Sequence, residues 1–87
     1  MNEKNLTHKE QVKTCIIYLD AFATRSNGWS EQDSYQLKHI IEKYYDCYIT
    51  NDAVIEAAAV LKFRAKQTTT HRDIFGFKLT KKLPSYR

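Results

Sequence analysis

The amino-acid sequence predicts an α+β fold in which three helices are followed by a C-terminal β-hairpin. Apolar residues recur at steps of three and four as far as Leu61, which is typical of helices. Beyond Leu61 they alternate with polar residues at a step of two, which is typical of a half-buried strand. The chain has 87 residues, which is enough for one domain.

The first helix is expected over about residues 8–25. Thr7 followed by Glu10 is a capping-box pattern, because both side chains can bond free amides at a helix start. Gly28 ends the following segment 26–28, and we expect it to stop the helix in the left-handed conformation. The apolar stripe of this helix is Val12, Cys15, Ile16, Leu19, Phe22 and Ala23.

The second helix is expected over about residues 31–45, with Ser30 as its N-cap and Asp33 three residues later. Its apolar stripe is Leu37, Ile40, Ile41, Tyr44 and Tyr45. The segment 46–49 that follows is too apolar for a free loop, so we expect it to tuck inward.

The third helix is expected over about residues 51–62, capped by Thr50 or Asn51. Its core side is Val54, Ile55, Ala58 and Leu61, and its exposed side is Asn51, Asp52, Ala53, Glu56, Ala57 and Val60. A helix that reads bases in the major groove normally offers Arg, Lys, Asn or Gln. The two carboxylates therefore argue against such reading, and the small residues favour a contact with a protein or with a second copy of this chain.

The hairpin is expected to place Phe63, Ala65 and Gln67 inward and the intervening cations outward, with a polar tip over 68–73. A two-stranded hairpin is marginal alone, so its large apolar side chains must pack on the helices. These are Phe63, Phe75, Phe77 and Leu79.

This order of elements is that of a winged helix. That fold usually adds a short strand between its first two helices, for which only residues 28–30 are available. The expected organisation is a flexible N-terminus over 1–6, one winged-helix-like domain over 7–83 and a tail over 84–87.

The segment from Tyr48 to Phe77 resembles the C-terminal half of small phage and prophage accessory proteins. In those proteins a short extended piece, here Tyr48-Ile49-Thr50, enters an alanine-rich helix, and a hairpin follows. The similarity rests on apolar spacing and small residues. It implies a phage or mobile-element protein with a winged-helix-like fold that binds DNA or blocks a host factor, and it transfers no functional residues.

Cationic residues gather at the end of the chain. Residues 1–61 hold six Lys or Arg and nine Asp or Glu, a net charge of −3, whereas residues 62–87 hold eight against one, a net charge of +7. Such asymmetry predicts a surface for polyanions. The expected nucleic-acid-binding residues are Lys62, Arg64, Lys66, Arg72, Lys78, Lys81 and Lys82. The simplest alternative is a solvated strand face that keeps the sheet edge from pairing.

The leading hypothesis is a small phage-type accessory or regulatory protein that binds nucleic acid through the basic hairpin. The alternative is a protein-binding inhibitor of a host machine, such as a nuclease complex (anti-CRISPR type) or a polymerase, in which the basic end occupies an acidic or nucleic-acid-binding surface. A homodimer is compatible with either. Trp29 is either a lid on the core or an interface anchor, and the expected protein interface is Trp29, Ala53, Ala57 and Val60.

Other chemistries find little support in the sequence. Cys15 and Cys47 stand far apart in apolar contexts, so we expect two buried free thiols. His39 near Asp46 and Cys47 lacks the spacing of zinc ligands. We see neither a catalytic motif nor a cofactor motif, and neither a signal peptide nor a membrane span. The expectation is a non-enzymatic cytoplasmic protein without metal or cofactor.

Overall fold

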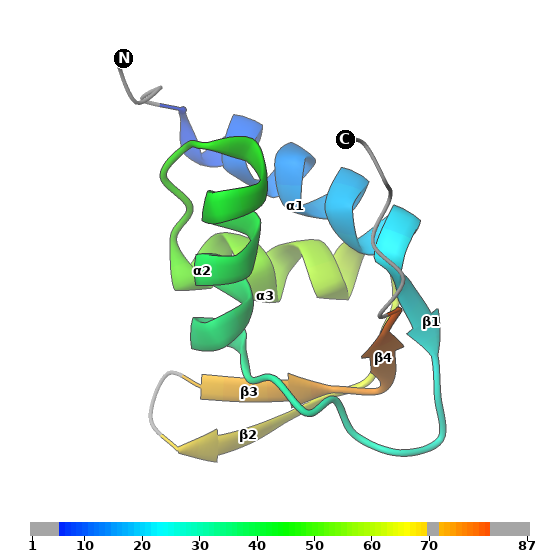
Figure 1. Cartoon of the computed structure of the whole chain (residues 1–87). Helices are drawn as coiled ribbons and strands as arrows, with labels where there is room; N and C mark the ends of the chain where they lie inside the picture. Colours follow the sequence, from blue (N-terminus) through cyan, green and yellow to red (C-terminus); the bar gives the residue numbers. More distant parts are fainter. Residues whose placement is uncertain (1–5, 70–71, 81–87) are drawn as a thin grey trace.

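The computed structural model describes residues 6–69 and 72–80. In this part of the chain it has three helices and a few short strands in two small antiparallel sheets, which confirms a mixed α+β fold (Figure 1). Strand β1 pairs with β4, and β2 pairs with β3. The elements are α1 (His8–Phe22), β1 (Ala23–Arg25), α2 (Ser34–Tyr45), α3 (Asn51–Val60), β2 (Ala65–Thr69), β3 (Arg72–Phe75) and β4 (Phe77–Leu79).

Helix α1 begins as predicted and ends early. Thr7 and Glu10 form the complete capping box. The helix stops at Phe22, and Ala23 turns to an extended conformation because residues 23–25 pair with β4. The expected end at 26–28 and the expected short strand at 28–30 are therefore wrong, and no described glycine has a positive φ. The end of α1 and the position of the short strand both depend on β4, which is distant in the sequence.

Ser30 ties the loop between β1 and α2 to strand β3 and does not cap a helix. Its N–H donates to the Phe75 carbonyl at 2.7 Å, and its hydroxyl accepts from the Phe75 N–H at 3.0 Å. The hydroxyl also donates to the Gln32 carbonyl at 2.7 Å. Asp33 is the N-cap of α2 instead, in a capping box with Gln36.

Helix α3 packs against α1 and α2 through its small residues. Ala53 and Ala57, which were expected on the exposed side, are fully buried, so neither is available to a partner. Because α1 and α2 both contact α3, they bury a wider face of this helix than one apolar stripe covers. The small alanine side chains allow the helix backbones to lie close together. Val60 is 54% exposed, as expected, whereas Ile55 is only half-buried.

The two phenylalanines that flank Gly76 complete the core, as predicted. Phe75 and Phe77 are fully buried and stack with their ring centroids 5.3 Å apart, and Phe63 meets Phe77 edge-on. Strand β2 behaves differently, because all five of its residues are exposed. Ala65 and Gln67 were expected inward, which is wrong: β2 lies outermost, with β3 between it and the helices (Figure 1).

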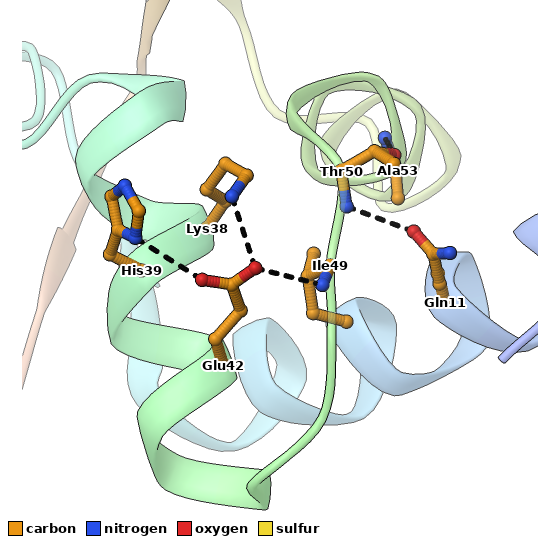
Figure 2. A network of polar contacts seen from close by, with 7 residues as sticks. All are labelled: Gln11, Lys38, His39, Glu42, Ile49, Thr50 and Ala53. Carbon is orange, nitrogen blue, oxygen red and sulfur yellow. Dashed lines mark hydrogen bonds and ion pairs between the residues drawn. The ribbon is translucent and has the colours of Figure 1, made fainter. Parts of the chain in front are cut away.

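The link between α2 and α3 tucks inward as predicted, with Cys47 and Ile49 buried. One carboxylate holds it in place: Glu42 accepts from the Ile49 N–H at 3.0 Å, from Lys38 Nζ at 3.0 Å and from His39 Nδ1 at 3.1 Å (Figure 2). Partial burial raises the pKa of Glu42, but the hydrogen bonds from Ile49 and Lys38 outweigh it and leave this pKa lowered. Glu42 is thus a structural anchor with both oxygens in use.

The C-terminal end of this link, where Thr50 caps α3, is also fixed by a side chain. The Gln11 side chain accepts from the Thr50 N–H at 2.9 Å (Figure 2). It also donates to the Leu6 carbonyl at 3.1 Å. Leu6 packs against the core, although residues 1–6 were expected to be flexible. Residues 1–5 and the expected tail 84–87 lie outside the described residues.

Candidate nucleic-acid interface

The predicted basic residues divide into two kinds. Lys62, Lys66 and Lys78 are exposed, whereas Arg64 and Arg72 are held by other groups of the protein. Lys81 and Lys82 lie outside the described residues. Arg64 was expected beside Lys62 and Lys66 on one strand face, and Arg72 at the hairpin tip, but both guanidinium groups contact other parts of the protein.

The three exposed lysines occupy three different segments near the sheets. Lys62 follows α3 with a left-handed backbone, φ 66°. Lys66 lies on β2 opposite Ile74, and Lys78 lies on β4 opposite Thr24. None of the three forms an ion pair with a carboxylate among residues 6–69 and 72–80. Their charges therefore remain available to a partner.

Arg64 ties the loop after β1 to the start of β2. Its guanidinium donates to the carbonyls of Ser26 and Gly28, both at 2.9 Å, and lies over the Trp29 ring at 4.3 Å from the centroid. The strand starts only at Ala65, so the alternation expected from Lys62 onward does not hold there. Arg64 is thus a structural cross-link between two segments.

Trp29 provides the ring on which these cations lie. Arg64 covers it, and Lys66 Nζ lies 5.7 Å from its centroid. The side chain is 36% exposed, so it is no lid on the core. Contacts between cations and a tryptophan face are favourable and hold the charges near a fixed position.

Arg25 belongs to this region, although the sequence analysis placed it at the end of the first helix. Its guanidinium donates to the carbonyls of Lys62 at 2.9 Å and Leu61 at 3.0 Å, and it lies over the Phe63 ring at 4.6 Å. These carbonyls belong to the open C-terminal end of α3, where a cation is favourable. No local pattern marks Arg25, because its place depends on the pairing of β1 with β4.

Arg25 and Arg64 line a common hollow. It has a volume of about 410 Å³, and its lining is Arg25, Ser26, Asn27, Arg64 and Gly76. No lining residue is acidic, and two of the five lining residues are arginines. The hollow is therefore electropositive, and it is suited to an anion.

Arg72 faces a different neighbour. Its guanidinium lies 3.6 Å from Asp33 Oδ2 and 4.6 Å from the centroid of the Tyr35 ring. The carboxylate partly neutralises it, so Arg72 contributes less to a polyanion surface than the sequence predicted. The capping role of Asp33 places this carboxylate beside β3.

Both cysteines are buried and neither is in a disulfide, as predicted. Burial, and then the neighbouring Cys47, raise the pKa of Cys15 to about 12, which keeps this thiol protonated and unreactive. No group of three or more His, Cys, Asp or Glu that could hold a metal ion occurs among the described residues.

Comparisons with protein-family models, with curated proteins and with solved structures find no match to this chain. Within the described part of the chain, no helix has the length and apolar character needed to cross a membrane.

Proposed function

We propose that this protein binds nucleic acid through the phosphate backbone. The basic surface that we assign to this role consists of Arg25, Lys62, Lys66 and Lys78, and the observation that carries the proposal is that its three lysines are exposed without a described carboxylate partner. The order α1, β1, α2, α3 and then β2 to β4 supports a winged-helix-like assignment, in which the β2–β3 pair is the wing. A phage or mobile-element accessory protein is the class that fits this proposal.

The charges favour contact with phosphates over reading of bases. Each lysine that neutralises a phosphate releases condensed counterions, which provides affinity without regard to sequence. The exposed side of α3 presents Asp52 and Glu56, which repel a phosphate backbone. We therefore expect little sequence specificity, and binding through the strand end of the molecule.

A salt titration tests this proposal. Fluorescence anisotropy with labelled single-stranded and duplex DNA at low salt should show binding at micromolar protein. The logarithm of the binding constant should then fall against the logarithm of salt concentration with a slope of about −3 to −4, for about four phosphate contacts. Absence of binding to both forms at low salt would end the proposal.

Two triple variants with equal charge make the test specific to the surface. Lys62→Gln/Lys66→Gln/Lys78→Gln removes three charges from the basic surface and should make the slope shallower by about 3. The control Lys9→Gln/Lys13→Gln/Lys43→Gln removes three exposed charges from the helices and should leave the slope within about 1 of the wild type. Equal losses in both variants would show that net charge alone governs binding.

A protein partner is the second candidate, and exposed aromatic residues favour it. Tyr35 is 42% and Tyr48 is 52% exposed, and Lys38 Nζ lies over both rings, at 5.8 and 5.2 Å. Tyrosine is enriched in protein interfaces relative to the rest of the surface. Tyr35→Ala/Tyr48→Ala should abolish capture of a host protein while DNA binding persists. The reverse pattern would reject this candidate.

A further inference from the structure

We infer that the hollow between Arg25 and Arg64 is a discrete site for one phosphate group. The lysines of the proposed function act as diffuse charges, whereas this site would hold a phosphate in a fixed position. The inference rests on the proposed function where the phosphate belongs to a nucleic-acid backbone. It stands separately where the phosphate is part of a small molecule.

The two guanidinium groups are already in place before any ligand arrives. Two carbonyls and the Phe63 ring hold Arg25, and two carbonyls and the Trp29 ring hold Arg64. An ordered arginine loses less conformational entropy on binding than a free one. A guanidinium also has more N–H donors than two carbonyls use, so both groups retain donors for an anion.

Arginine is the side chain best suited to a phosphate oxygen pair, because its planar fork can donate two parallel hydrogen bonds. The free Asn27 side chain adds a neutral donor, since its amide has no hydrogen bond with a described residue. No carboxylate lines the hollow to compete with the anion. The chemistry therefore selects an oxyanion with several acceptor oxygens.

Gly76 keeps the hollow open beside Arg64. A Cβ at this position would lie 2.7 Å from Arg64 Nε and 2.8 Å from one of its terminal nitrogens. The Gly76 N–H donates to the Arg64 carbonyl, and its own carbonyl accepts from the Ser26 N–H, so its backbone is fixed. A side chain at 76 must therefore displace the Arg64 guanidinium.

The volume of about 410 Å³ exceeds that of a phosphate alone and lies within the range of small-ligand sites, about 300–1,000 Å³. The phosphate can thus come from a nucleic-acid backbone or from a phosphate monoester such as a mononucleotide. Three probes separate these sources: inorganic phosphate, a mononucleotide, and a thymidine dinucleotide that has a backbone phosphate and no terminal one.

The experiment is an NMR titration of the arginine Nε–H signals with each probe, against sodium chloride at matched ionic strength. Phosphate should shift the signals of Arg25 and Arg64 and leave that of Arg72, which serves as the internal control. The dinucleotide should shift the same signals if the source is a backbone. A response to the mononucleotide but not to the dinucleotide would support the site and assign it to a phosphate monoester.

Three variants test the geometry. Arg25→Lys keeps the charge but loses the fork, and should weaken phosphate binding about fivefold. Gly76→Ala should weaken it similarly by moving Arg64. Asn27→Ala leaves the fold contacts intact and should weaken it about twofold. Thermal unfolding of each variant confirms that it is folded.

Equal shifts at Arg25, Arg64 and Arg72, or the same response to chloride, would overturn the site. So would an Arg25→Lys and an Asn27→Ala variant that are folded and bind phosphate like the wild type. In these cases the proposed function would still be supported if DNA binding depends on salt and is weakened in the lysine triple variant. Phosphate binding without DNA binding would instead support the phosphate site and reject the proposed function.

Discussion

Strands β2 and β3 are paired with each other but belong to different environments. Strand β3 ends in the fully buried Phe75, and its backbone bonds Ser30 and, through the Asp73 N–H, the Ser34 hydroxyl. Strand β2 exposes all five residues and carries Lys66 outward. The inner strand, β3, is part of the core, whereas the outer strand, β2, is held by its pairing with β3.

This difference shows that an alternating sequence does not by itself bury a strand. A residue of β2 that alternates inward still lacks a layer to pack against, because the helices cover β3. Lysine on the exposed outer strand then has two effects: it discourages pairing with other chains, and it offers charge to a polyanion. The following predictions test the comparison, from the largest expected effect to the smallest.

Phe75→Ala should destabilise the protein most. It removes a fully buried ring that stacks on Phe77 and leaves a cavity between the sheet and the helices. We expect a loss of about 3–5 kcal/mol in the free energy of unfolding, measured by urea denaturation. For so small a domain this loss approaches the whole stability. A loss below about 1 kcal/mol would show that β3 is not part of the core.

Arg64→Gln should cost about 2 kcal/mol, because it removes two hydrogen bonds to carbonyls and the contact with Trp29. Lys66→Gln is the matched change on the outer strand, and it should stay within about 0.5 kcal/mol. Urea denaturation of both variants gives the comparison. Equal stabilities would mean that Arg64 is a surface charge like its neighbour.

Glu42→Gln tests the helical side of the molecule and should cost about 1 kcal/mol at neutral pH. Since the pKa of Glu42 is lowered from 4.5, its ionised form stabilises the fold above that pH. This contribution is lost as the pH falls through the lower, folded value. Stability measured from pH 6 to pH 3 should therefore decline less steeply in the variant. Parallel curves would contradict the anchoring of Ile49.

Gln67→Ala should have the smallest effect, within about 0.5 kcal/mol. The side chain lies on the outer strand and bonds only the nearby Thr69 carbonyl among the described residues, at 3.2 Å. Thermal unfolding in parallel with the wild type measures it. A large loss would show that β2 supports the fold more than its exposure indicates.

Local patterns in the sequence predicted a good part of the fold. The capping box at Thr7, the three helices, the inward link at Ile49 and the burial of Phe75 all follow from neighbouring residues. The short strand at 23–25 could not be predicted, because it exists only by pairing with β4. The burial of Ala53 and Ala57 likewise required knowledge of the helices around them.

For the candidate site, the sequence predicted the positive charge but not the contacts of the arginines. The exposed lysines followed from composition, since a basic segment with few carboxylates leaves its cations unpaired. Arg25 was missed and Arg64 was assigned the wrong environment, because both bind carbonyls far away in the sequence. Contacts between a side chain and a distant backbone leave no periodic signal.

The position of Arg25 at the end of α3 also lowers the positive charge that it can offer to an anion. The carbonyls of Leu61 and Lys62 already draw on its positive charge, so an incoming oxyanion meets a guanidinium that is partly compensated. A phosphate would therefore gain less electrostatic energy from Arg25 than from a guanidinium without carbonyl partners.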